Sequence, residues 1–158
     1  MRLYHGSNME IVQIDLTKSN KFKDFGQAFY LSADKHQAKL LAESRADFLG
    51  GEPMVNPFEY DEHLAKTMSL KIKVFEYYCL EWASFVWNNR DEQQDFHHDY
   101  DIVYGPIMND TIGFQMREYR MHHTDLKGFL EGIKFEKGET FQWAFCTQRA
   151  ISCLKRLK

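Results

Sequence analysis

Residues 25–34 read FGQAFYLSAD, and this stretch combines a turn, a strand and the start of a helix. Gly26 favours a turn, and the aromatic residues of 28–31 favour a strand. Residues 32–34 are typical of a helix N-terminus, where a side-chain oxygen caps a free backbone amide. Apolar residues then recur at helical spacing as far as Leu49, and Gly50-Gly51 supplies the end of the helix. The sequence therefore predicts a loop–strand–helix unit.

The segments around this unit mix strands and helices in an irregular order. Further strands are predicted at 1–5, 54–60, 67–75, 100–104 and 139–147, with an acidic connector at Asp61-Glu62 and a break at Gly105-Pro106. Helices are predicted at 79–87, from a cap at Asn109 or Asp110 through Arg120, from a cap at Thr124 or Asp125 through Leu130, and at 148–158. This order predicts an α+β fold with mainly antiparallel pairing rather than a doubly wound parallel sheet.

Composition narrows the class of protein. A length of 158 residues with 44% hydrophobic residues predicts one domain that spans 1–158. The net charge is −3 and Lys and Arg are scattered, so the sequence lacks the basic stripe of a nucleic-acid-binding protein. Three dispersed cysteines do not form a disulfide framework, and the N-terminus has no apolar signal segment. We therefore expect a cytoplasmic protein that does not associate with membranes.

Three short stretches together point to a function. They are YHGS at 4–7, FGQAFYLS at 25–32 and FQWAF at 141–145. Taken in order, they resemble the three motif positions of the NAD-dependent ADP-ribosyltransferase superfamily in its His-Tyr branch. YDIVYGPIMND at 100–110 and FQWAFCTQRA at 141–150 extend the resemblance to a bacterial family that is grouped with these transferases by motif.

The resemblance implies a fold, a cofactor and an activity. The implied fold is a split pair of mostly antiparallel sheets around an NAD cleft. The implied activity is transfer of ADP-ribose from NAD to an acceptor, a protein rather than a nucleic acid, by a bacterial toxin or defence effector. An antitoxin or regulatory protein is the partner that such an effector would require.

The resemblance also assigns roles to single residues. His5 would bond the adenosine ribose, the Gly6 backbone would hold the nicotinamide amide, and Tyr30 would stack on the nicotinamide ring. Gln142 stands where many relatives carry a glutamate that bonds the other ribose. The implied catalytic residues are Gln142, Tyr30 and His5, and the implied NAD-binding residues are His5, Gly6, Ser7, Tyr30, Arg90 and Asp110.

Gln142 is the main departure from the family pattern. Its amide can make a hydrogen bond but brings no negative charge near the developing sugar cation. Losing a charge-assisted contact costs about 1–3 kcal/mol, so turnover would be slower or would depend on a nearby acid such as Glu139. On this basis Gln142→Glu is expected to accelerate cleavage.

Other interpretations remain open at this stage. Tyr30 could be a core residue, Gln142 an outward strand position, Asp110 only a helix cap, and Arg90 a surface ion pair. The chain could be a nucleotide-binding module without turnover, or an RNA 2′-phosphotransferase, which would need several basic residues at its pocket. The pairs His97-His98 and His122-His123 do not predict a metal site, because adjacent side chains diverge.

Overall fold

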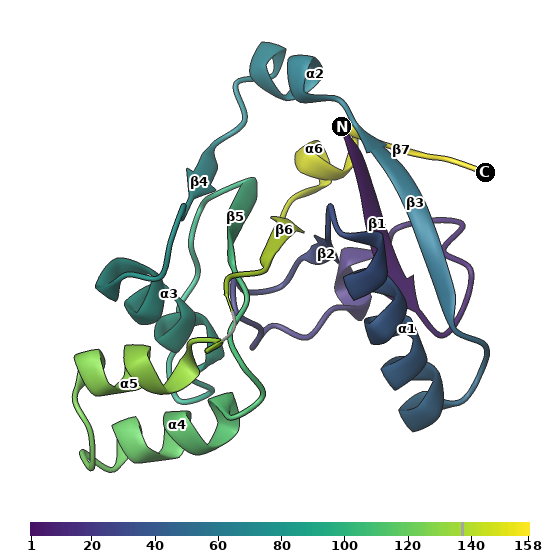
Figure 1. Ribbon diagram of the computed structural model, residues 1–158. Helices are drawn as coiled ribbons and strands as arrows, with labels where there is room; N and C mark the ends of the chain where they lie inside the picture. Colours follow the sequence, from purple (N-terminus) through teal and green to yellow (C-terminus); the bar gives the residue numbers. More distant parts are fainter. Residues whose placement is uncertain (137) are drawn as a thin grey trace.

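The computed structural model describes residues 1–136 and 138–158 (Figure 1). The strands are β1 (Arg2–Ser7), β2 (Phe29–Leu31), β3 (Met54–Tyr60), β4 (Ile72–Val74), β5 (Ile102–Pro106), β6 (Phe141–Phe145) and β7 (Leu154–Arg156). The α-helices are α1 (Lys35–Leu49), α2 (Glu62–Thr67), α3 (Leu80–Arg90), α4 (Ile112–Arg120), α5 (Leu126–Ile133) and α6 (Gln148–Ile151), and a short 3₁₀ helix spans Leu16–Lys18.

The strands form two sheets, and the predicted α+β class with mostly antiparallel pairing is confirmed. One sheet has the order β1-β3-β7, and the other has the order β2-β6-β5-β4. Only the β4–β5 pair is parallel within these two sheets. Tyr4 and Ser32 exchange backbone hydrogen bonds of 2.8 and 2.9 Å, which ties β1 to the end of β2. The two sheets therefore meet at the strands that carry YHGS and FYLS.

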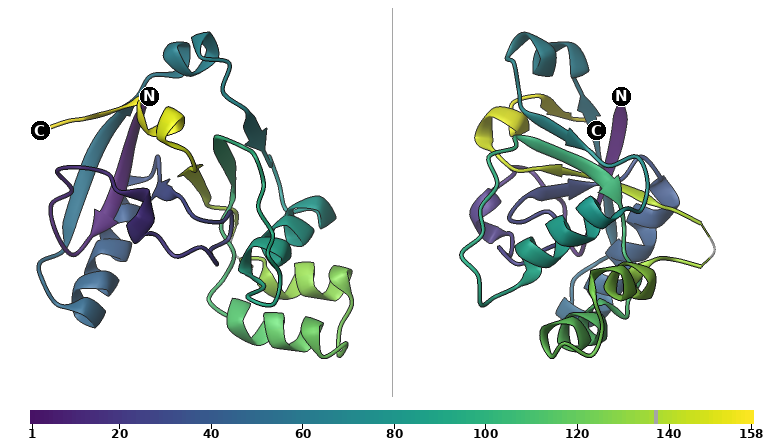
Figure 2. Two further views of the ribbon diagram at one scale, coloured as in Figure 1. Left: turned by 180° about the vertical axis from the view of Figure 1, so that it is seen from behind. Right: turned by 90° about the vertical axis from the view of Figure 1, so that its left-hand side faces the viewer.

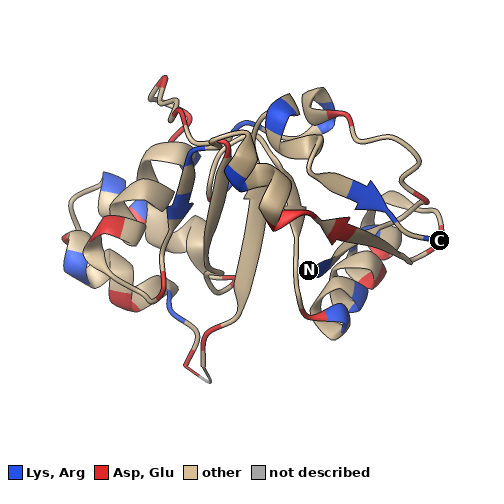
Figure 3. Cartoon of the chain, turned by 90° about the horizontal axis from the view of Figure 1, so that it is seen from above, with Lys and Arg blue, Asp and Glu red and all other residues tan. Residues whose placement is uncertain are grey.

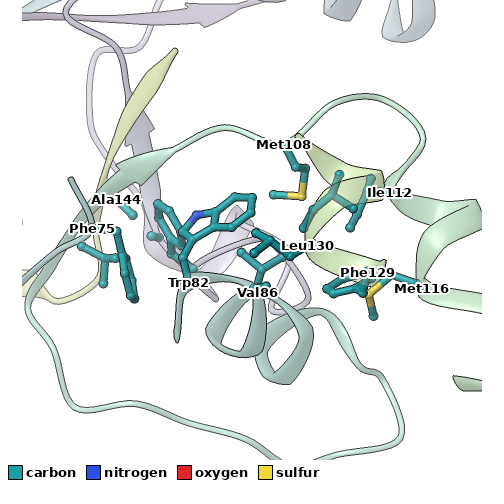
Figure 4. Packing of buried hydrophobic residues seen from close by; sticks show 14 residues of the cluster. Phe75, Trp82, Val86, Met108, Ile112, Met116, Phe129, Leu130 and Ala144 are labelled. Carbon is teal, nitrogen blue, oxygen red and sulfur yellow. The ribbon is translucent and has the colours of Figure 1, made fainter. Parts of the chain in front are cut away.

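Helices flank the two sheets (Figures 1 and 2). Helix α1 lies against β1 and β3, whereas α3, α4 and α5 gather beside the four-stranded sheet. Figure 4 shows the core on that helical side, where Trp82 is fully buried among side chains of the sheet, α3 and α5. Its indole nitrogen donates to the Pro106 carbonyl at 3.1 Å, which satisfies the one polar atom of this side chain. A second core joins the two sheets through Leu3, Ile102 and Phe145.

Local sequence signals set α1 as expected. The Asp34 carboxylate accepts a hydrogen bond from the His36 amide at 2.8 Å, and Gly50 ends the helix with φ 78°. Ala38 and Ala42 are its buried residues and bring the helix backbone close to β1. The helix therefore starts within the predicted range 32–34, because the Asp34 side chain caps its first turn.

Several predicted boundaries were wrong. The acidic connector begins α2, because the Asp61 carboxylate caps the Leu64 amide at 2.8 Å. The strand predicted at 67–75 is reduced to β4. Strand β5 continues through Gly105-Pro106, since it pairs with β6 as far as Phe141 and Pro106 is its last residue.

Two further corrections concern helix ends. The segment 148–158 is not one helix, because residues 154–156 pair with β3 as strand β7. Helix α4 starts after Thr111, which makes no side-chain cap, and Asn109 accepts from the Thr111 amide instead. Helix α5 is capped by Asp125, one of the two expected candidates.

Charged residues are mixed over the surface. Figure 3 shows Lys and Arg interspersed with Asp and Glu across the elements rather than gathered on one of them. Within residues 1–136 and 138–158, no helix has the length and apolar character needed to cross a membrane.

Candidate active site

His5 lies near the end of β1 and faces the second sheet. Its ring stacks on Phe29 with centroids 4.3 Å apart, and only 7% of the residue is exposed. The Nδ1 atom lies 2.7 Å from the Tyr30 carbonyl, and Nε2 lies 3.3 Å from Arg45 Nη1. A carbonyl only accepts and a guanidinium only donates, so Nδ1 carries the proton and Nε2 accepts. His5 thus links β1, β2 and α1.

This environment keeps His5 neutral. Burial lowers the pKa of His5 to about 4, and the nearby cations Arg45 and Lys23 add to the effect. The neutral ring can offer Nε2 as an acceptor, and in this structure Arg45 occupies that atom. A ribose hydroxyl at Nε2 would take the place of this contact.

Tyr30 anchors the loop that precedes β2. Its hydroxyl donates to the Gly26 carbonyl at 2.7 Å and accepts from the Phe25 amide at 3.1 Å. The ring is half-buried, and the Lys23 ammonium lies 5.3 Å from its centroid. Burial, followed by the charge of Asp24, raises the pKa of Tyr30 well above its ordinary value. The hydroxyl therefore stays protonated and holds Phe25 and Gly26 in place.

We expect Tyr30→Phe to destabilise the fold by about 1–3 kcal/mol, because it leaves a buried amide and a buried carbonyl without their partner. For a chain of this size each kcal/mol lowers the melting temperature by about 2–4 °C. Thermal unfolding should be compared with Tyr77→Phe, since Tyr77 is 61% exposed. Equal melting temperatures for the two variants would show that the hydroxyl contacts do not stabilise the loop.

Gln142 lies on β6, on the same sheet face as Tyr30. Tyr30 pairs with Ala144, and residues two apart on a strand share a face. The Gln142 side-chain nitrogen donates to Asp24 Oδ2 at 2.9 Å, and Arg90 Nη1 contacts the other oxygen, Asp24 Oδ1. The Asp24 side chain is only 14% exposed, so this contact is held in a largely desolvated place.

Two cavities meet at Tyr30. The main cavity has a volume of about 520 Å³ and is lined by His5, Ser7, Lys23, Phe29, Tyr30, Arg45 and the loop 8–19. The small cavity has a volume of about 60 Å³ and is lined by Gly6, Tyr30, Ser32, Gln142 and the adjacent part of α1. Tyr30 lines both cavities, so it lies beside His5 in the main cavity and beside Gln142 in the small one. Gln142 and His5 lie in different cavities.

Gly6 has a structural reason for being glycine. A β-carbon built there would lie 2.0 Å from the Ala38 carbonyl oxygen and 2.9 Å from the Ala42 amide nitrogen. The Gly6 carbonyl accepts a hydrogen bond from Arg45 at 3.2 Å. The missing side chain therefore lets α1 pack directly on β1, and it also lets the Gly6 backbone line the small cavity.

The sequence interpretation missed two cations. Lys23 and Arg45 line the main cavity, and burial lowers the pKa of both. Within residues 1–136 and 138–158, neither side chain forms an ion pair with a carboxylate. Because they are 22 positions apart and carry no shared motif, only the fold reveals that both face His5 and Tyr30.

The remaining predicted residues are placed as follows. Ser7 is buried and lines the main cavity. Arg90 pairs with Asp24 and does not line the main cavity, so its role as a diphosphate ligand has no geometric support. Asp110 is exposed and lines neither cavity. Glu139 is also exposed, and its charge contributes to the raised pKa of Tyr78.

A third hollow of about 300 Å³ lies beside the loop 94–100 and contains His97 and His98. His98 Nε2 lies 2.7 Å from the Phe25 carbonyl, and His97 pairs with Asp95. In the part of the chain that the structure describes, no three His, Cys, Asp or Glu side chains gather as metal ligands.

Residues 1–156 match the family described as "Protein of unknown function (DUF3990)". The chain belongs to this family. None of the curated proteins and none of the solved structures compared with the chain matches it. Membership of the family extends over both sheets and both cavities, so the site described above belongs to the part that matches.

Proposed function

We propose that the protein transfers ADP-ribose from NAD to an acceptor. The observation that carries this proposal is the meeting of Gly6, Tyr30 and Gln142, from three strands, around one small cavity that adjoins the main cavity at Tyr30. The volume of the main cavity, about 520 Å³, lies in the range of small-molecule sites. Concave sites built from residues far apart in sequence are the usual places for such ligands.

The chemistry needed is modest and suits these residues. Cleavage breaks the bond between the ribose C1 atom and the nicotinamide nitrogen, and the electron pair leaves with neutral nicotinamide. The sugar becomes positively charged until an acceptor oxygen or nitrogen bonds C1 and loses its proton. Tyr30 would contact the nicotinamide ring, and Gln142 would accept a hydrogen bond from a ribose hydroxyl.

Lys23 and Arg45 suit the diphosphate of NAD better than Arg90 does. Both are cations that line the main cavity, whereas Arg90 pairs with Asp24 and does not line it. A hydrogen bond to a charged group contributes about 1.5–3 kcal/mol, so we expect Lys23→Gln and Arg45→Gln each to weaken NAD binding by about 10- to 100-fold.

Calorimetric titration with NAD measures this effect. Lys39→Gln is the matched control, because Lys39 lies on the exposed side of α1, where it pairs with Glu43. Arg45→Gln also removes the contact with His5, so its melting temperature should be measured beside its affinity. Unchanged affinity in both cavity variants would place the diphosphate elsewhere.

The uncharged Gln142 favours a second candidate, a nucleotide-binding module without turnover. Incubation of the purified protein with NAD, followed by chromatographic measurement of nicotinamide, separates the two. Release of nicotinamide supports the enzyme, whereas NAD binding without release supports the module. The third candidate, an RNA 2′-phosphotransferase, needs several basic residues at its pocket, and Lys18, Lys23 and Arg45 line the main cavity.

A second arm of the same experiment identifies the class of molecule that accepts ADP-ribose. Labelled NAD added with cell lysate transfers its label to the acceptor class. We favour a protein acceptor, since the net charge of −3 and the scattered basic residues do not suit a polyanion. A toxin or defence role with a neutralising partner protein remains part of this proposal.

A further inference from the structure

The contact between Gln142 and Asp24 fixes which way the Gln142 amide points. A carboxylate has no proton to donate, so the NH₂ group of Gln142 must face Asp24 Oδ2, at 2.9 Å. The amide oxygen of Gln142 is therefore turned away from Asp24. It is the atom that remains for a hydroxyl donor in the small cavity, which Gln142 lines.

Asp24 is itself held firmly. Arg90 contacts Asp24 Oδ1, the oxygen that Gln142 does not use. The Gly26 amide donates to the Lys23 carbonyl at 3.0 Å in a tight turn around Asp24, and the Tyr30 hydroxyl closes the same turn at Gly26. The Asp24 carboxylate is thus a fixed negative charge beside the amide rather than a mobile surface group.

We propose that Asp24 is a positioning residue, which orients the Gln142 amide with its oxygen toward the small cavity. This inference rests on the proposed NAD cleavage. When a carboxylate accepts a hydrogen bond from the amide nitrogen, the amide is polarised and its oxygen becomes a stronger acceptor. The Gln142–Asp24 pair thereby takes the place of a single glutamate. Asp24 is the acid that contacts Gln142 in this structure.

The pair predicts an unusual result for single substitutions. In Asp24→Asn the side chain keeps one oxygen, and this oxygen accepts the hydrogen bond from the cation Arg90. The new NH₂ group therefore faces Gln142, and the Gln142 amide must turn around to present its oxygen to it. In Gln142→Glu two carboxylates face each other, and one must take up a proton. Each single variant should therefore lower kcat for nicotinamide release by about 10- to 100-fold with little change in KM. This reverses the acceleration that the sequence alone suggested for Gln142→Glu.

The double variant Asp24→Asn with Gln142→Glu again pairs each hydrogen-bond donor with an acceptor among positions 24, 90 and 142. The oxygen of the introduced asparagine faces Arg90, and its NH₂ group faces the introduced carboxylate. We expect kcat to recover at least about tenfold over either single variant. Asp47→Asn, on the exposed face of α1, is the control for loss of one acidic residue. Loss of activity from misfolding alone would lower the melting temperature and would not be repaired by the second change.

A second measurement is independent of turnover. Side-chain ¹H–¹⁵N NMR signals of Gln142 should differ between the wild type and Asp24→Asn, because the variant removes the carboxylate that accepts from the Gln142 nitrogen, and they should stay unchanged in Asp47→Asn. Wild-type kcat in Asp24→Asn, or no recovery in the double variant, would overturn the catalytic part of the proposal. Gln142 signals that are the same in the wild type and in Asp24→Asn would overturn the orientation. If the wild type releases no nicotinamide, the proposed function fails together with the catalytic role of Asp24, and the NMR result alone decides the orientation.

Discussion

Gly6→Ala is expected to destabilise the protein by about 3 kcal/mol, at the upper end of the cost of overpacking. The new methyl group would lie 2.0 Å from the Ala38 carbonyl oxygen, which belongs to a helix backbone and cannot move as a side chain could. Either α1 moves away from β1 or β1 bends. Both responses disturb the wall of the small cavity, which Gly6 lines.

Urea unfolding measures the effect, and Gly113→Ala is its matched control. A β-carbon at Gly113 meets nothing within 4 Å, and Gly113 lies in α4. Alanine there should stabilise the protein by up to about 1 kcal/mol, because it is the better helix former. Equal stability of Gly6→Ala and the wild type would show that the packing of α1 on β1 differs from that described here.

Stability should also fall steeply as the pH drops from about 6.5 to 4, and His5 is the cause. Its pKa is about 4 in the folded protein and 6.5 in the unfolded chain, so the unfolded state binds a proton first. The contribution of His5 is fully present above pH 6.5 and is lost as pH falls toward 4. A difference of this size corresponds to about 3 kcal/mol in total, of which about 2 kcal/mol is lost by about pH 5.

His5→Asn tests this origin. The free energy of unfolding should be measured at about pH 7 and at about pH 5. The loss of stability between these two pH values should be about 2 kcal/mol smaller in His5→Asn than in the wild type. His36→Asn is the control for the loss of one histidine, because His36 is exposed on α1 and away from the main cavity. If the pH dependence of stability persists in His5→Asn, other titrating groups are its cause.

The contacts of β1 with Arg45 make any effect of His5 or Gly6 on ligand binding hard to separate from an effect on folding. His5 holds Arg45 through Nε2, and the Gly6 carbonyl holds Arg45 as well. Substitution of either residue therefore also displaces a cation of the main cavity. Affinity data for β1 variants should be compared with the Lys23 variant, which leaves β1 intact.

Several features could be predicted from sequence because their causes lie within a few residues. The strand at β1, the strand at β3 and helix α1 with its Asp34 cap are set by side-chain periodicity and by local hydrogen bonds. The irregular order of these elements was enough to predict the α+β class. His5, Tyr30 and Gln142 were identified as candidates from ordered motifs, and the structure places Tyr30 beside each of the other two.

What the sequence could not decide depends on partners far along the chain. Strand β7 exists because residues 154–156 complete the free edge of β3, although a helix was predicted there. Asp24 meets Gln142 across 118 residues, and Lys23 and Arg45 reach one cavity from a loop and a helix. Such contacts are decided by packing of the two sheets, since no local pattern encodes which side chains a folded chain brings within hydrogen-bonding distance. The sequence determined the elements and the candidate residues, and tertiary structure decided which charges stand beside them.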